Sequence, residues 1–167
     1  MVSGGFRTEH LTVRPWRSED ASWYSAAIDD EVIRWTRLSG NPSGAEWEKI
    51  VESGAMANAS ASFCIENEFG DAVGALGKKL HSDTVELSYW LAAAGRGHGY
   101  AREALAGAVV WCADSHPGTP IVLEIHPGNG ASIAVAEKTG FVFDGLRSSC
   151  ASCADDNGHV AVYVMAS

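Results

Sequence analysis

The sequence has no long apolar run, which excludes a membrane-spanning helix. A span needs roughly 20 consecutive apolar residues, and charged side chains interrupt every stretch of this 167-residue chain before that length is reached. The first five residues carry no basic charge followed by an apolar segment, so no secretory signal is predicted. We therefore expect a cytoplasmic protein without a membrane partner.

Basic residues are also few. The chain has 12 lysines and arginines against 21 aspartates and glutamates, and its formal net charge is −9. A surface that binds duplex nucleic acid normally needs a basic stripe, so we expect no nucleic-acid partner. At encounter range an acidic protein instead favours small cations or basic peptides.

Cysteine is scarce as well, with four residues in the chain. Cys150 and Cys153 form a C-x-x-C pair, but no second pair lies at the spacing of a zinc site, and no strand-to-helix redox context surrounds it. Without a secretory signal, cysteines are expected as reduced thiols. We expect no metal site, and we interpret the pair as two incidental residues of a polar loop.

The elements that are present indicate a mixed sheet. Capping signals at Ser18, Asp29 and Ser43 predict three helices in the first half, and strand–helix–strand order in the second half predicts one parallel pair in an otherwise antiparallel sheet. We expect one domain over residues 1–167. The predicted helices cover 18–27, 29–35, 43–57, 101–116 and 131–139, and the predicted strands cover 11–14, 62–66, 72–80, 84–91, 120–126, 141–147 and 160–165.

Three alternating glycines, Gly95, Gly97 and Gly99, join a predicted strand to a predicted helix. Glycine lets backbone N–H groups approach a ligand closely, and a helix N-terminus adds unpaired donors and partial positive charge. This arrangement is typical of a phosphate or pyrophosphate site. A Walker A loop would need lysine where Tyr100 stands, and the dinucleotide fingerprint would need glycine in place of Arg102.

The pattern Arg96-x-x-Gly99-x-Ala101 resembles the glycine loop of the GCN5-related N-acetyltransferase (GNAT) family. The segment 129–141 is similar to the second cofactor segment of that family. The resemblance extends over about residues 8–165. It is closest to the branch that contains ribosomal-protein N-terminal alanine and serine acetyltransferases.

This resemblance implies a fold and a cosubstrate. The fold is of the α/β (α+β) type, with a mixed, mostly antiparallel sheet that is flanked by helices and splays apart between the strands ending at Leu91 and His126. Acetyl-CoA would lie in the gap, with its pyrophosphate on the glycine loop and its thioester carbonyl against the backbone of strand 87–91. The residues that the resemblance places around acetyl-CoA are Leu91, Arg96, Gly97, His98, Gly99, Tyr100, Ala101, Asn129, Ser132 and Lys138.

Two carboxylates are candidates for the general base that deprotonates the acceptor amine. Glu124 stands in the apolar strand 121–125, where a carboxylate is costly unless it is hydrogen-bonded or useful, and Glu86 stands on the strand before the glycine loop. Either carboxylate can act directly or through a water. Many family members protonate the leaving thiolate with a tyrosine, but the matching residue here is Ala136. Ser132 is the candidate acid in its place, with Tyr163 second and solvent as the alternative.

The resemblance implies a primary amine as acceptor, and the branch implies a peptide or protein N-terminus. Two alternatives stay open: a small amine, such as an antibiotic or polyamine acetylated for self-protection, and a non-catalytic acyl-CoA sensor. Recognition is expected from residues 28–60 and 146–159. Trp35, Trp47 and Trp90 are candidates for a pocket wall or for the core. We expect a monomer or a homodimer.

Overall fold

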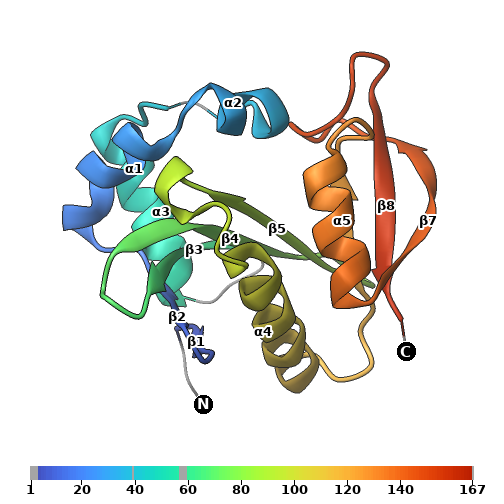
Figure 1. The fold of residues 1–167 in the computed structure, drawn as a ribbon, viewed down its shortest axis with the longest axis horizontal. Helices are drawn as coiled ribbons and strands as arrows, with labels where there is room; N and C mark the ends of the chain where they lie inside the picture. The colour runs from blue at the N-terminus through green and yellow to red at the C-terminus, as the bar shows by residue number, and fades with distance from the viewer. Residues whose placement is uncertain (1–3, 39, 57–59, 167) are drawn as a thin grey trace.

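The computed structural model describes residues 4–38, 40–56 and 60–166, and it is built on one eight-stranded sheet (Figure 1). Across this sheet the strands follow the order β1-β2-β3-β4-β5-β6-β8-β7. The strands are β1 (Phe6–Arg7), β2 (Leu11–Pro15), β3 (Ser60–Asn67), β4 (Ala72–Leu80), β5 (Val85–Leu91), β6 (Ile121–Ile125), β7 (Phe141–Ser148) and β8 (His159–Met165). The helices are η1 (Ser18–Asp20), α1 (Ala21–Ala27), α2 (Asp30–Thr36), α3 (Gly44–Met56), η2 (Ala93–Gly95), α4 (Tyr100–Ser115) and α5 (Gly130–Thr139).

β5 and β6 form the one parallel pair among the described strands, and this pair is short. It joins 85–87 to 121–123, and all other neighbouring strands are antiparallel. Beyond Leu87 and Leu123 the two strands continue to Leu91 and Ile125 without pairing to each other. The sheet therefore opens between β5 and β6, as predicted.

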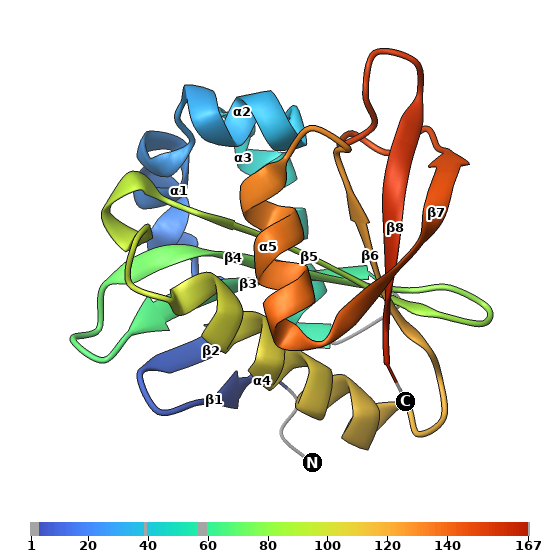
Figure 2. The ribbon, with the colours of Figure 1, turned by 45° about the vertical axis from the view of Figure 1, so that its right-hand side comes forward.

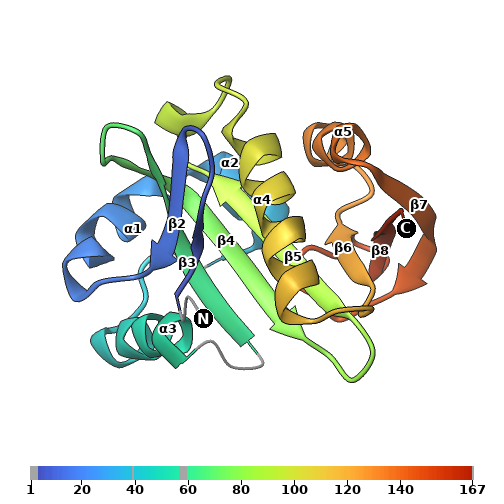
Figure 3. The same ribbon diagram turned by 90° about the horizontal axis from the view of Figure 1, so that it is seen from below.

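Helices cover both faces of the sheet. α4 and α5 pack on one face, and α1, α2 and α3 pack on the other (Figures 2 and 3). α4 packs on the sheet through one apolar stripe, in which Ala104, Leu105, Ala108 and Cys112 are each at most 1% exposed. The second face is rich in aromatic rings, and Trp16, a buried residue just after β2, contacts the rings of Trp23, Tyr24 and Trp47.

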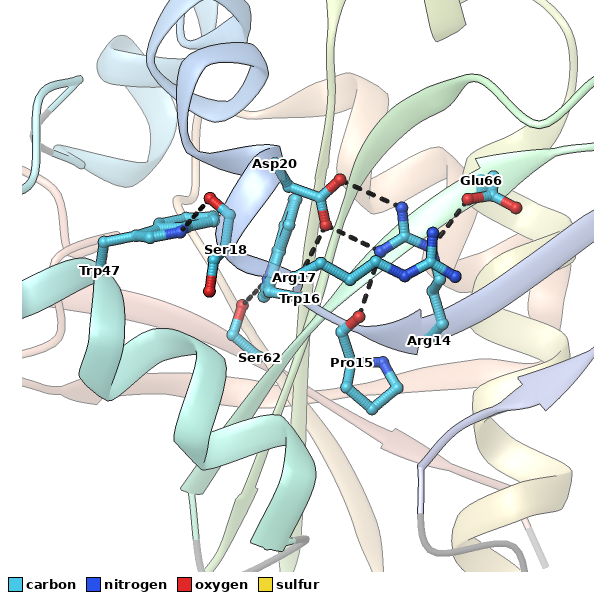
Figure 4. Close-up of polar contacts among 9 residues, drawn as sticks. All are labelled: Arg14, Pro15, Trp16, Arg17, Ser18, Asp20, Trp47, Ser62 and Glu66. Carbon is cyan, nitrogen blue, oxygen red and sulfur yellow. Dashed lines mark hydrogen bonds and ion pairs between the residues drawn. The ribbon is translucent and has the colours of Figure 1, made fainter. Parts of the chain in front are cut away.

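A hydrogen-bonded arginine fixes the start of α1 against the sheet (Figure 4). The Arg14 guanidinium on β2 donates to Glu66 on β3 (2.7 Å) and to Asp20 (2.8 Å). Asp20 also accepts the Arg17 N–H (2.8 Å). Burial disfavours the Asp20 carboxylate, but these hydrogen bonds outweigh burial and lower the pKa of Asp20. The prediction of Ser18 as the N-cap is therefore wrong. The residue before the helical segment is Arg17, and its N–H donates to the Asp20 carboxylate.

The other capping predictions are confirmed. The Asp29 carboxylate accepts the Val32 N–H at the start of α2, and Ser43 and Glu46 form the expected capping box before α3. Gly140 closes α5 with a φ of 104°. The predicted end of the third helix, residue 57, lies outside the described residues, and the two-residue strand β1 was not predicted.

Candidate active site

A cavity of about 780 Å³ passes through the gap between β5 and β6. On the face of α4 and α5 its lining includes Ala101, Asn129, Ala131, Ser132 and Val135. On the face of α1 to α3 its lining includes Tyr24, Val32, Trp35, Thr36, Lys49, Ile50, Ser53, Ser62 and Lys79. Between the two faces, the cavity is lined by residues of β5 and β6 and by the residue after β6. These are Glu86, Ser88, Tyr89, Trp90, Leu91, Glu124 and His126. One space thus connects the two faces of the sheet.

The glycine loop presents an array of unpaired N–H groups. Gly97 and Gly99 adopt φ values of 80° and 81°, and a Cβ at either position would meet no atom of the described chain within 4 Å. Within the described residues, the N–H groups of 97–102 have no acceptor, and the first bonded N–H is that of Glu103, to Gly99 O (3.1 Å). Gly95 differs, because a Cβ there would lie 2.7 Å from Val73 O. The open donors at the N-terminus of α4 fit a pyrophosphate.

The Arg96 side chain lies away from this donor array. Its guanidinium binds Asp29 through two bonds of 2.9 Å and the Leu91 carbonyl through bonds of 3.2 and 3.0 Å. The bonds from Arg96, and after them the bond from the Val32 N–H, lower the pKa of Asp29 to about 2. Arg96 thus ties the glycine loop both to the end of β5 and to the start of α2.

The structure places the remaining loop and helix candidates at different depths. Leu91 and Ala101 line the cavity, whereas His98, Tyr100 and Lys138 do not. The rings of His98 and Tyr100 stack on each other with centroids 5.3 Å apart. Lys138 is exposed in the last turn of α5. A role for these three side chains in cofactor binding stays a prediction.

The β5 edge that faces the gap carries free backbone donors. The Val85 N–H donates to Pro120 O across the parallel pair, and N–H groups alternate in direction along a strand. The N–H groups of Leu87, Tyr89 and Leu91 therefore face the same side. Since the pairing to β6 ends at Leu87, the last two open into the gap, where a thioester carbonyl would accept a hydrogen bond.

Asn129 and Ser132 form a closed hydrogen-bonded pair at the start of α5. The Ser132 N–H donates to Asn129 Oδ1 (3.2 Å), and Asn129 Nδ2 donates to Ser132 Oγ (3.1 Å). The Ser132 hydroxyl accepts from Asn129, so its own proton stays available for donation into the cavity. Tyr89 donates to the Ser132 carbonyl (3.4 Å), and burial raises the pKa of this phenol. Ala136 is fully buried.

Both candidate bases line the cavity, and each already has a protein partner. Glu124 Oε2 accepts the Ser149 hydroxyl (3.0 Å), which leaves Oε1 open. Glu86 lies 2.8 Å from His81 Nε2. The alternative pairing of Glu86 with a lysine is not present among the described ion pairs.

His126, Tyr89 and Cys153 are among the cavity residues that were not named as site residues from the sequence. His126 follows Glu124 at the strand period of two, and that spacing is the signal that could have found it. Its Nδ1 accepts the Gly128 N–H (2.9 Å). The Cys153 thiol donates to the Glu124 carbonyl (3.4 Å), and burial raises the pKa of this thiol to about 11. No local pattern marks Cys153, because its place depends on the path of the loop 149–158.

The three tryptophans divide between the pocket wall and the core. Trp35 and Trp90 line the cavity, and the Trp35 ring contacts the His126 ring edge-on at 5.1 Å. Trp47 is buried in the cluster under α1 and α3. All four cysteines are free, as expected.

A split sheet with an open donor array on one side and carboxylates on the other defines an acyltransferase that takes a phosphate-bearing acyl donor. Residues 10–142 match the family model described as "Acetyltransferase (GNAT) domain". The chain belongs to the GNAT family and is an acetyl-CoA-dependent acetyltransferase. No curated protein matches the chain in sequence.

Solved structures support the same fold. A putative ribosomal-protein-serine acetyltransferase from Vibrio cholerae has a TM-score of 0.81 at 17% identity, over 98% of this chain and 97% of that chain. Mycobacterium smegmatis RimJ in complex with CoA-disulfide has a TM-score of 0.77 at 22% identity, over 93% and 81%. A spermidine N-acetyltransferase from V. cholerae with CoA and spermine has a TM-score of 0.75 at 16% identity, over 95% and 96%. These likenesses leave the acceptor open.

Within the described residues, no group of three or more His, Cys, Asp or Glu side chains is arranged to hold a metal ion. In the same part of the chain, no helix combines the length and apolarity that crossing a membrane requires.

Proposed function

We propose that the protein, acting as a single domain over residues 1–167, transfers the acetyl group of acetyl-CoA directly to the primary amine of a peptide N-terminus. The observation that carries this proposal is the cavity through the sheet. It extends from Ala101, Asn129 and Ser132 on the face of α4 and α5 to the carboxylates Glu86 and Glu124. The acyl donor and the acceptor can therefore approach one reaction centre from opposite faces.

The acceptor must lose a proton to attack. An α-amino group has a pKa of about 8 and a lysine amine has a pKa of about 10.4. An N-terminus therefore needs less help from a base to become neutral. We assign the base to Glu124, with Glu86 as its rival, because Glu124 is the one carboxylate of the apolar strand β6, which ends beside Asn129, and its Oε1 is open. The amine nitrogen bonds to the acyl carbon, its proton passes to Glu124, and the carbon–sulfur bond breaks.

The leaving thiolate then takes a proton. Ser132 is positioned to relay it, because Asn129 orients the Ser132 hydroxyl with its proton free. The hydroxyl gives this proton to the sulfur and takes another from water. Solvent is the second source, since a thiol of pKa about 8.5 leaves readily as the thiolate. This arrangement replaces the tyrosine that Ala136 cannot provide, and it supports an enzyme over a non-catalytic sensor.

The test measures CoA release and acetyl mass gain with N-terminal peptides, spermidine and aminoglycosides. We expect peptides to be acetylated and Glu124→Gln to lower kcat by about 10²–10⁴ at neutral pH, with acetyl-CoA affinity nearly unchanged. The loss should shrink at high pH, where the amine is neutral unaided. Full activity of Glu124→Gln with loss in Glu86→Gln would move the base to Glu86. Acetylation of spermidine alone would overturn the peptide acceptor.

A further inference from the structure

We propose that the acceptor carries a carboxylate or phosphate close to its primary amine, and that Lys49 and Lys79 recognise this anionic group. The inference deepens the proposed function and rests on it. It concerns the end of the cavity that α3, β3 and β4 form, on the face opposite the glycine loop. The whole chain is acidic, so this end differs in charge from the molecule around it.

A row of hydroxyl groups crosses this end of the cavity. Ser62 on β3 pairs in register with Gly77 on β4, and Gly77 pairs with Ser88 on β5. Gly77 has a packing reason, since a Cβ there would lie 2.4 Å from the Ser88 hydroxyl. Ser53 on α3 extends the row, because its hydroxyl accepts the Ser62 N–H (3.3 Å). All of these residues line the cavity.

The two lysines reach the same row from separate elements. Lys79 follows Gly77 by two residues, so both lie on one face of β4. Lys49 precedes Ser53 by four residues, so both lie on one face of α3. Both lysines line the cavity and are exposed at its rim. Two ammonium groups thus border the Ser62 and Ser88 hydroxyls, which suits a carboxylate or phosphate. The Ser53 hydroxyl donates its proton to the Ile50 carbonyl (2.7 Å) and holds the row in place.

The lysines are free, whereas the cavity carboxylates are engaged. Neither Lys49 nor Lys79 belongs to an ion pair in the described part of the chain. The Glu46 carboxylate, three residues before Lys49, is occupied by the Ser43 N–H (2.7 Å).

The three cavity carboxylates each have a partner in the protein: Glu31 accepts the Trp35 indole N–H (2.7 Å), Glu86 contacts His81, and Glu124 accepts from Ser149. Hydrogen bonds leave these carboxylates charged, but none of the three belongs to α3, β3 or β4, and Glu86, which lies opposite Lys79 in register, already contacts His81. The charged side chains that the described residues of α3, β3 and β4 contribute to the cavity wall are all lysines. A polyamine would bring further cations toward the two lysines, whereas an amine with a nearby anion satisfies both ends of the site.

The experiment uses the full chain and peptides that share an N-terminal Ala but carry Asp-Asp, Asn-Asn or Lys-Lys next. Aspartate, phosphoethanolamine and spermidine complete the panel. We expect kcat/KM for the Asp-Asp peptide to exceed that for the Asn-Asn peptide by roughly fivefold to tenfold at low salt, because exposed ion pairs are individually weak. Higher ionic strength should reduce this preference.

Variants separate recognition from folding. Lys49→Met with Lys79→Met keeps the apolar stems and should abolish the preference, while the KM for acetyl-CoA stays unchanged. Arginine at both positions should restore it. Arg147→Ala is the control, because it removes one surface cation from β7, where Arg147 pairs with Asp144 and does not line the cavity.

The outcomes distinguish this inference from the proposed function. Equal acetylation of the three peptides would overturn the inference and leave the peptide acceptor standing. Acetylation of aspartate or phosphoethanolamine but no peptide, with the same dependence on the lysines, would support the inference and overturn the peptide acceptor. A preference for spermidine would overturn both.

Discussion

At the scale of single residues, Gly99 combines a backbone conformation and a place that together suggest ligand contact. Its φ of 81° is in the left-handed region, and the space where a side chain would begin is open. A non-glycine residue pays about 1–2 kcal/mol in that region, and its Cβ would stand among the donors of the loop.

Gly99→Ala should raise the Kd for CoA by about tenfold in a calorimetric titration, a loss of roughly 1.4 kcal/mol. Gly118→Ala is a matched control, because Gly118 has a φ of 77°, an equally open surround and no part in the cavity wall. Both variants should lose similar stability. Equal CoA affinity in the two variants would contradict a cofactor role for the loop.

Several residues that line the cavity were predicted from the sequence. The family resemblance indicated Asn129 and Ser132, and Glu124 was noticeable as a charge in an apolar strand. The Arg96 side chain shows where such reasoning stops. Its partner Asp29 lies 67 residues away in the chain, so no local spacing announces that the guanidinium faces α2 rather than the open donors.

At the scale of elements, this same pair joins α2 to the glycine loop. Asp29 caps α2 with one oxygen and binds Arg96 with both. α2 supplies Val32 and Trp35 to the cavity wall. The glycine loop therefore helps, through Arg96, to fix the position of α2 and of the part of the cavity wall that α2 forms.

Asp29→Asn should raise the KM of the acceptor by about twofold to fivefold and the KM of acetyl-CoA by less. Asparagine caps helices about as well as aspartate, so the change removes the ion pair and keeps the cap. The expected effect is small because a partly exposed ion pair contributes little free energy. Steady-state kinetics of Asp29→Asn, Arg96→Gln and the double variant check this. Additive effects in the cycle would show that the two residues act independently.

Helix caps followed from the sequence where the capping residue is local, as at Asp29 and Ser43. The cap was wrong at Ser18, because the deciding carboxylate of Asp20 is held by Arg14 from a strand. The strand β1 is only two residues long, too short for alternation to reveal it.

At the scale of the whole molecule, several carboxylates make folding sensitive to acid. The pKa of Asp29 is lowered to about 2 by Arg96. Burial works against ionisation of Asp20 and Glu103, but their hydrogen bonds outweigh it and lower both pKa values. The unfolded chain binds these protons more readily. The stability that these groups contribute is therefore full above pH of about 4 and is lost as the pH falls toward 2.

Urea unfolding from pH 5 to pH 2 should show a steep loss of stability, and Asp29→Asn should flatten it. Asp71→Asn serves for comparison, since Asp71 is exposed and enters no ion pair within the described residues. The same slope in the wild type and in Asp29→Asn would mean that the Asp29–Arg96 pair does not contribute.

The unequal distribution of aromatic rings over the two faces has an optical consequence. Five tryptophans lie on the side of α1 to α3 or line the cavity from it: Trp16, Trp23, Trp35, Trp47 and Trp90. Trp111 belongs to α4 and packs beside Phe63 on the other face. Five of the six tryptophans thus emit from the acceptor side, and two of them, Trp35 and Trp90, would be touched by an incoming acceptor. Intrinsic fluorescence therefore reports chiefly on that half of the molecule, so the unlabelled protein provides a direct titration signal for candidate acceptors.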